Sequence, residues 1–180
     1  MRVRKLLDKE EILSIIRRLA KNIVNYYNSE LNLVVVLEGA RRFALDLVDE
    51  ILKIKSIKIN IFYIKLSSYG SGTSSSGKVI VEKDIKENLE GKDLLIVEDI
   101  VDTGITINFL RSYLLNNKKA GSVRICTLLD KPSRRKVNVE LDYVGYEVPN
   151  KFVVGYGVDF DGKYRELDYI GFLEQNVDKK

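Results

Sequence analysis

The stretch that decides the fold of this 180-residue chain is Leu94-Leu95-Ile96-Val97-Glu98-Asp99-Ile100-Val101-Asp102-Thr103-Gly104-Ile105-Thr106, because it joins a buried strand to a helix. Its first residues form a continuous apolar run, which predicts a strand at 93–97 buried on both faces. Ile107, Leu110 and Leu114 then recur at helical spacing and predict a helix at 105–115. In open α/β sheets ligands bind beyond the carboxyl ends of the strands, so the polar turn is the expected site.

The rest of the chain repeats this alternation of strands and helices. Apolar runs or apolar-polar alternation predict strands at 33–37, 57–63, 79–81, 123–129, 142–147 and 152–156. Helical spacing predicts amphipathic helices at 8–27 and 41–52, and Asp8 with Glu11 forms a capping-box-like start to the first. The pattern predicts an α/β fold with a central parallel sheet flanked by helices on both faces. The tail beyond Pro132 is expected to cap that sheet.

The polar turn has the composition of a phosphate-binding site. Gly104 permits a tight turn, and the first turn of the following helix presents free N–H groups and a partial positive charge to an anion. Thr103 and Thr106 add hydroxyl donors. The structural alternative is that Asp102 or Thr103 caps the helix while Glu98 and Asp99 form a solvated turn. Five polar residues directly after one apolar strand favour the functional interpretation.

Composition excludes several other kinds of chemistry. The chain has no histidine, so Ser-His or Cys-His catalysis and histidine zinc sites are excluded, and acid–base work falls to Asp, Glu, Lys or Tyr. Cys126 is the single cysteine and is expected to fill the core. Neither a P-loop motif nor a complete dinucleotide glycine motif is present.

The charge pattern favours a small anionic substrate over a polyanion. The net charge of +4 is spread along the chain in doublets such as Arg41-Arg42 and Arg134-Arg135, so no nucleic-acid partner is expected. The charged start, residues 1–11, lacks the apolar region of a signal peptide, and no apolar stretch is long enough to span a bilayer. We therefore expect a cytoplasmic protein without a membrane partner.

At residues 97–106 the sequence resembles the type I phosphoribosyltransferases, whose phosphoribosyl pyrophosphate motif it matches. The resemblance covers nearly the whole chain, and Lys131-Pro132, residues 142–157 and residues 159–167 are similar to the hypoxanthine-guanine branch. It implies a single phosphoribosyltransferase domain over 1–180, with a core at about 8–130, a C-terminal hood at about 131–175 and a flexible flap loop at 67–77. It also implies Mg²⁺ as cofactor and a homodimer or homotetramer.

The resemblance assigns the ribose and 5′-phosphate of the activated sugar to the residues of the polar turn. Glu98 and Asp99 would contact the ribose hydroxyls and anchor a magnesium ion, since this cation prefers oxygen ligands. The 5′-phosphate would be held by Thr103, Gly104, Ile105 and Thr106. Asp102, which also borders the sugar, would be the catalytic general acid/base at purine N7.

The same resemblance assigns the purine and pyrophosphate to residues of the tail. Lys131, Phe152, Val153 and Asp159 would surround the purine, with Phe152 stacking on the ring and Asp159 also holding a second magnesium ion. Arg165 would balance the charge of the pyrophosphate leaving group. A lysine has only donors, so Lys131 favours the O6 carbonyl of hypoxanthine or guanine over the amino group of adenine. A plain surface charge is the structural alternative for Lys131.

Two loops complete the predicted site. Residues 67–77 lack periodicity, and the resemblance makes them a flap, with Ser68 and Tyr69 at its start, that shields the reaction from water. Glu38 and Gly39 occupy the pyrophosphate loop, where relatives usually carry a basic residue in place of Glu38. A carboxylate at this position would repel pyrophosphate. Two explanations of how the loop still binds it stay open: backbone N–H groups bind the anion, with a non-proline cis peptide at Leu37-Glu38, or Arg41 or Arg42 supplies the positive charge.

The expected activity is transfer of the 5-phosphoribosyl group to N9 of hypoxanthine or guanine, giving IMP or GMP and pyrophosphate. Two alternatives are open. One is a phosphoribosyltransferase that prefers xanthine, which Lys131, Phe152 and Val153 do not exclude. The other is a non-enzymatic, ligand-sensing regulator on the same fold, which is expected to carry a DNA-binding module or a strongly basic face.

Overall fold

A six-stranded, mostly parallel sheet forms the centre of the molecule in a computed structural model that describes residues 2–68 and 78–174. The strand order is β4-β3-β2-β5-β6-β7, and only the pairing of β3 with β4 is antiparallel. The strands are β2 (Glu30–Leu37), β3 (Lys58–Ser68), β4 (Val79–Lys83), β5 (Asp93–Val101), β6 (Ser122–Asp130) and β7 (Tyr143–Glu147). The predicted α/β class with a parallel sheet is confirmed.

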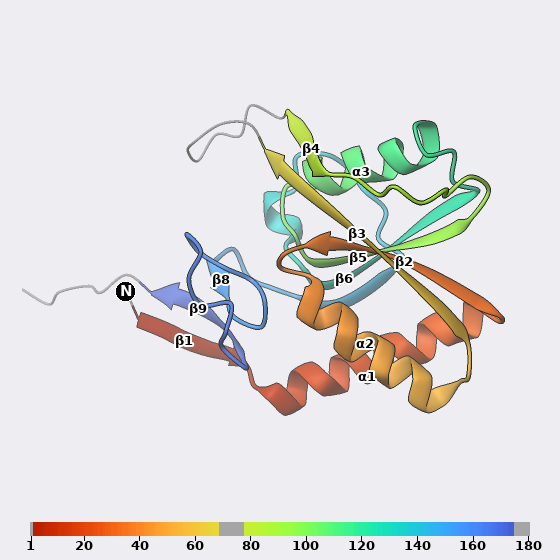
Figure 1. Cartoon of the computed structure of the whole chain (residues 1–180). Helices are drawn as coiled ribbons and strands as arrows, with labels where there is room; N and C mark the ends of the chain where they lie inside the picture. The colour runs from red at the N-terminus through yellow and green to blue at the C-terminus, as the bar shows by residue number, and fades with distance from the viewer. Residues whose placement is uncertain (1, 69–77, 175–180) are drawn as a thin grey trace, which may run out of the picture.

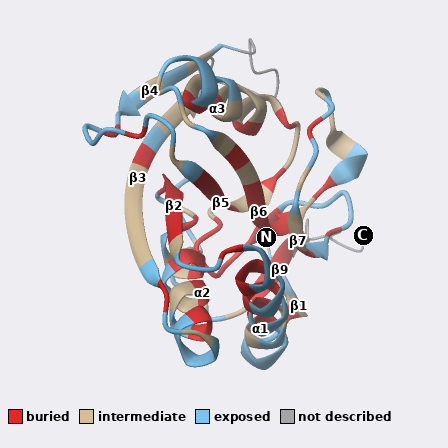
Figure 2. Cartoon of the chain, turned by 90° about the vertical axis from the view of Figure 1, so that its right-hand side faces the viewer, coloured by how far each residue is buried: buried red, intermediate tan, exposed pale blue. Residues whose placement is uncertain are grey.

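Helices cover both faces of this sheet, as Figure 1 shows. α1 (Lys9–Tyr26) and α2 (Arg41–Ile54) lie together on one face, and α3 (Ile105–Asn116) lies on the other. Each face has its own core cluster: Leu33 and Val35 point toward α1 and α2, whereas Val34 and Ile96 join the cluster that contains Leu110 of α3. Figure 2 shows the result, with buried residues along the central strands and exposed residues on the outer faces of the helices.

Local signals in the sequence set the boundaries of α1. Asp8 accepts a hydrogen bond from the backbone N–H of Glu11 at 2.9 Å, and the Glu11 carboxylate accepts one from the Asp8 N–H at 2.8 Å. The predicted capping box is therefore confirmed.

Cys126 is fully buried, as expected for a core-filling residue, and burial raises the pKa of its thiol. None of the helices in the described part of the chain combines the length and apolar character needed to cross a membrane.

The cap differs from the sequence-based expectation in two of its strands. A three-stranded sheet, β1-β9-β8, is built from β1 (Arg2–Leu7), β8 (Val153–Val154) and β9 (Ile170–Glu174). β1 was not predicted, because half of its residues are charged, its apolar residues form neither a run nor a regular alternation, and it is held by pairing with β9, far away in sequence. β7 was expected in the cap but pairs with β6 and extends the main sheet instead. A short 3₁₀ turn, η1 (Pro132–Arg134), follows β6.

Parallel pairing brings three strand ends to the same edge of the sheet. Val35 of β2 pairs with Val97 of β5, and Val101 of β5 pairs with Asp130 of β6. The small sheet lies at this end, toward which the arrow of β2 points (Figure 1). The residues that follow these strands, among them Glu38, Asp102 and Lys131, therefore lie around a common region under the cap.

Candidate active site

The segment from β5 to α3 forms a polar cavity of about 220 Å³. β5 is longer than predicted, so Glu98 and Asp99 lie within the strand, near its carboxyl end, and not in a loop after it. The cavity is lined by Glu98, Asp99, Ile100, Val101, Asp102, Thr103, Gly104, Thr106 and Ile107. The structure thus brings the predicted sugar-phosphate residues together, except that the side chain of Ile105 does not line the cavity.

The turn before α3 has the geometry that its glycine allows. Gly104 adopts φ +83°, in the left-handed region, and a Cβ there would lie 2.7 Å from the carbonyl oxygen of Val137. Thr103 Oγ1 accepts a long hydrogen bond, 3.4 Å, from the N–H of Ile105. The first bond inside the helix runs from Asn108 N to Gly104 O at 3.0 Å. The N–H groups of the first turn therefore have no helical acceptor and can bind a phosphate.

Two neighbouring carboxylates form the floor of the cavity. Glu98 is only 8% exposed, and its Oε1 accepts a hydrogen bond from the N–H of Asp99 at 3.1 Å. Asp99 Oδ1 accepts one from the N–H of Ile100 at 2.8 Å. Burial raises the pKa of Glu98 well above its ordinary value, and the charge of Asp99 adds to this. Burial also raises the pKa of Asp99, although the charge of Arg165 opposes that shift.

The predicted pyrophosphate loop lies directly against one of these carboxylates, Asp99. A Cβ at Gly39 would overlap the carboxylate oxygen of Asp99 and lie 2.8 Å from its Cγ, so only a glycine fits beside Asp99. The peptide bond between Leu37 and Glu38 is cis, as one of the two proposed solutions for this loop requires. Glu38 Oε2 lies 3.5 Å from Arg41 Nη2, so the carboxylate is paired with a residue of the second solution.

The cap supplies the groups predicted to contact the purine. Lys131 is 4% exposed, not a surface charge, and its Nζ donates a hydrogen bond of 2.6 Å to the carbonyl oxygen of Lys151. Burial lowers the pKa of Lys131, and the nearby charge of Asp102 partly offsets this. The Phe152 ring is 53% exposed, its centroid lies 5.8 Å from Lys131 Nζ, and it contacts Phe160 edge-on. Val153 is buried in β8.

Asp159 and Arg165 pair with each other in the cap. Arg165 Nη2 lies 2.7 Å from Asp159 Oδ1, and the Asp159 Oδ2 atom accepts a hydrogen bond from the N–H of Gly162 at 2.7 Å. Within residues 2–68 and 78–174, no three Asp, Glu or Cys side chains form a cluster that could hold a metal ion. Asp159 therefore does not form a three-residue cluster with Glu98 and Asp99, and the assignment of magnesium to these residues stays a prediction.

Of the two predicted flap residues, Ser68 is described and Tyr69 lies outside the described residues. Ser67 and Ser68 were expected in the structureless loop, but they belong to β3 and pair with Ile80 and Val79 of β4. Antiparallel pairing with β4 extends β3 beyond the end that its apolar alternation predicted.

Comparison with known proteins decides the family. The sequence matches the phosphoribosyl transferase domain family over residues 2–161. The chain belongs to this family. It is 42% identical, over 97% of its length and 95% of the relative, to the hypoxanthine-guanine phosphoribosyltransferase of Streptococcus thermophilus. A crystal structure of a hypoxanthine phosphoribosyltransferase from Staphylococcus aureus superposes with a TM-score of 0.87 at 40% identity, covering 98% of this chain and 94% of that one.

A further relative is much longer than this phosphoribosyltransferase chain. The bifunctional protein TilS/HprT of Listeria monocytogenes is 44% identical over 96% of the chain, but the match spans only 26% of that relative. The resemblance stated from the sequence is thus confirmed at the level of the family. The roles of the individual site residues stay predictions.

Sequence reasoning missed a group of arginines in this phosphoribosyltransferase site. Arg134 and Arg135 were noted as a scattered basic doublet, yet both contact the chain around Asp102. Arg41 was considered as a source of charge, but its pairing with Glu38 was not foreseen. The i, i+3 spacing of Glu38 and Arg41 at the start of α2 was the one local signal available.

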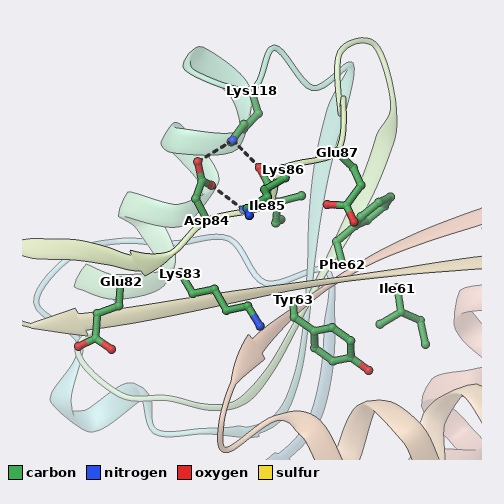
Figure 3. Close-up of a pocket in the computed structure, with 10 residues that line it drawn as sticks. All are labelled: Ile61, Phe62, Tyr63, Glu82, Lys83, Asp84, Ile85, Lys86, Glu87 and Lys118. Atoms are coloured by element: carbon green, nitrogen blue, oxygen red, sulfur yellow. Dashed lines mark hydrogen bonds and ion pairs between the residues drawn. The ribbon is translucent and has the colours of Figure 1, made fainter.

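A second cavity, of about 850 Å³, lies against β3 and the chain after β4 (Figure 3). Lys118, which lines this cavity, donates hydrogen bonds of 2.7 Å to both Asp84 and the carbonyl oxygen of Ile85, so the lysine charge is compensated by the Asp84 carboxylate. Figure 3 shows Phe62 and Tyr63 on opposite sides of β3, with Lys83 extended toward Tyr63. This cavity lacks the helix start and paired carboxylates of the first, which is therefore the candidate active site.

Proposed function

We propose that this chain transfers the 5-phosphoribosyl group of phosphoribosyl pyrophosphate to N9 of hypoxanthine or guanine, giving IMP or GMP and pyrophosphate. The N9–C1′ bond forms, the bond from C1′ to the pyrophosphate oxygen breaks, and the N7 proton of the purine passes to Asp102. The observation that carries the proposal is the single cavity in which Glu98, Asp99 and Asp102 face the first turn of α3. The names of the full-length relatives support the same substrates.

The donor set fits Mg²⁺ as a cofactor. Glu98 and Asp99 are adjacent carboxylates whose pKa values are raised by burial, and a divalent cation would offset the cost of holding both ionised. We expect them to hold one ion beside the ribose hydroxyls, and Asp159 to help hold a second beside the pyrophosphate. The cation would supply neutralising charge to the leaving pyrophosphate.

Lys131 gives the proposed preference for 6-oxopurines. Its buried ammonium can turn from the Lys151 carbonyl to the O6 atom of a purine, while the exposed face of Phe152 stacks on the ring. A buried donor that loses its acceptor is costly, so the amino group of adenine is rejected. Backbone groups near Val153 would meet the other edge of the base.

For the pyrophosphate we propose the backbone of Gly39 together with Arg165. Gly39 lies against Asp99, and the charge of Arg165 acts to lower the pKa of Asp99, so both would be available to a pyrophosphate bound beside that carboxylate. The pairing of Glu38 with Arg41 removes the repulsion that an isolated carboxylate would exert on the anion.

Neither alternative function is favoured. Xanthine carries the same O6 and N7 atoms, so a preference for it would rest on its additional 2-oxo group. A ligand-sensing regulator would bind nucleic acid, whereas basic residues near the site such as Arg41, Arg134 and Arg165 are paired with acids. We propose instead a cytoplasmic enzyme that acts on small-molecule substrates, without a nucleic-acid or membrane partner.

A homodimer or homotetramer completes the proposal. Leu45 and Leu52, two turns apart on α2, are 48% and 50% exposed and present an apolar face that a second copy could cover. Light scattering after size exclusion measures the mass. A monomer at micromolar concentration would contradict this part of the proposal without affecting the chemistry.

The direct test measures pyrophosphate release from phosphoribosyl pyrophosphate with magnesium and, in turn, hypoxanthine, guanine, xanthine and adenine. Turnover with the first two and little with adenine is expected. Asp102→Asn should lower kcat by roughly 10²-fold or more, since general acid–base catalysis contributes about this much. Its KM for phosphoribosyl pyrophosphate should change little. No release with any purine, together with tight DNA or RNA binding, would favour the regulator.

A further inference from the structure

The turn after β6 holds the loop that carries Asp102. The backbone N–H groups of Lys136 and Val137 donate to the carbonyl oxygen of Thr103 at 2.9 and 3.2 Å. Arg135 reaches back from the same turn, and its Nε donates to the carbonyl oxygen of Asp102 at 3.1 Å. Its Nη2 donates to the carbonyl oxygen of Val101 at 3.4 Å. The backbone around Asp102 is thus fixed by contacts from one short segment.

The side chain of Arg135 is itself held in place by an ion pair and by packing against the loop. Its guanidinium forms an ion pair with Asp130, the last residue of β6, and about five-sixths of the Arg135 side chain is shielded from solvent, at 17% exposure. The Arg135 Cδ atom would lie 2.8 Å from a Cβ at Gly104, so the side chain packs directly against the turn that begins α3. Arg135 therefore contacts the loop both through its backbone carbonyls and at the turn that begins α3.

Arg134, the neighbouring residue, faces the carboxylate of Asp102 instead of its backbone. Its Nε lies 3.4 Å from Asp102 Oδ1, and the two side chains are 35% and 38% exposed. Oδ1 itself is buried and accepts no hydrogen bond from any residue in the described part of the chain. The exposed surface of Asp102 must therefore belong to the rest of the side chain, including Oδ2.

From this arrangement we infer that Arg134 is a positioning residue that holds Oδ1 of Asp102 and leaves Oδ2 directed at the purine. The inference rests on the proposed function, in which Asp102 accepts the N7 proton. A free carboxylate can rotate and present either oxygen, whereas the ion pair with Arg134 favours the orientation that keeps Oδ1 beside the guanidinium and leaves Oδ2 free. Arg134 touches no substrate in this role and acts only through Asp102.

The other cations around Asp102 are engaged elsewhere. Lys131 Nζ donates to the Lys151 carbonyl and is reserved for the purine O6 atom in the proposed reaction. Arg135 contacts Asp102 through the backbone carbonyl oxygen and forms its ion pair with Asp130. Of Lys131, Arg134 and Arg135, it is therefore Arg134 that is available to the Asp102 carboxylate.

The test compares Arg134→Gln, Arg134→Lys and Asp102→Asn, alone and combined, in the full chain. A partly exposed ion pair contributes modestly, so Arg134→Gln should lower kcat by roughly three- to tenfold. The KM for phosphoribosyl pyrophosphate should stay within about twofold, since the sugar is held by other groups. Arg134→Lys should restore much of kcat. Arg111→Gln is the matched control, because Arg111 lies two turns into α3 and does not line the cavity.

The double variant distinguishes positioning from a general structural effect. Because Arg134 acts through Asp102, adding Arg134→Gln to Asp102→Asn should cause no further loss of kcat. An equal loss in both backgrounds would overturn the inference, and so would full turnover of Arg134→Gln beside an impaired Asp102→Asn. Full turnover of Asp102→Asn would overturn the assignment of the base in the proposed function, and this inference with it.

Discussion

Gly39→Ala tests the contact between the pyrophosphate loop and the carboxylate floor of the site. The new methyl group would overlap the Asp99 carboxylate oxygen and lie 2.8 Å from Cγ, so the carboxylate must retreat by about 1 Å. In doing so it would give up the 2.8 Å hydrogen bond from the N–H of Ile100. A misplacement of about 1 Å costs roughly 10²-fold in rate when it affects an aligned reactive group.

We therefore expect kcat/KM for phosphoribosyl pyrophosphate to fall by roughly 10²-fold, with a loss of about 1–3 kcal/mol in the free energy of unfolding. Steady-state kinetics at saturating hypoxanthine and urea denaturation measure the two effects. Gly91→Ala is the matched control: it has φ +71° and no atom within 4 Å of a new Cβ, so it should cost about 1 kcal/mol of stability and leave turnover unchanged. Parental kinetics for Gly39→Ala would refute the proposed contact.

The remaining predictions concern the charged groups of the site. Burial raises the pKa of Glu98 in the folded state, so between the unfolded and folded pKa values the magnesium-free protein loses stability as pH rises. Glu98→Gln should accordingly raise the melting temperature at pH 7 by roughly 2–4 °C, an advantage that should shrink in acid; equal melting temperatures at all pH values would contradict this. Glu38→Lys should free Arg41 and strengthen product inhibition by pyrophosphate about two- to fivefold, and an unchanged inhibition constant would mean that the side chain at 38 points away. Lys131→Met should lower kcat/KM for hypoxanthine by at least about tenfold and reduce the discrimination against adenine, measured with the four purines; retained selectivity would assign it to another group.

Local patterns predicted the elements that depend on local physics. The apolar runs of the central strands and the capping box of α1 were identified because burial on both faces and helix capping leave a signal within a few residues. β1 and the extension of β3 to Ser68 were missed, since each depends on pairing with a strand outside its own pattern. No periodicity in a single segment reports such a partner.

The site shows the same division between local and distant signals. The grouping of Glu98, Asp99 and Asp102 could be predicted because they follow directly on an apolar run in the sequence, and they line one cavity. The contacts of Arg134 and Arg135 with Asp102 could not be assigned, because Asp102 lies more than 30 positions away in the sequence and is brought near by the pairing of β5 with β6. A basic doublet looks the same in a sequence whether it is solvated or holds a loop.

The pairing of charges in the site has a consequence for how a polyanionic substrate binds. Arg41, Arg134 and Arg165 are each within 4 Å of a carboxylate, so none offers an uncompensated charge. A substrate carrying several negative charges must therefore draw on the N–H groups of α3 and on cations from solution, or displace an acid from its arginine. Affinity for phosphoribosyl pyrophosphate should accordingly depend steeply on free magnesium. A dissociation constant that is independent of magnesium, measured by calorimetry, would mean that the arginines exchange partners on binding.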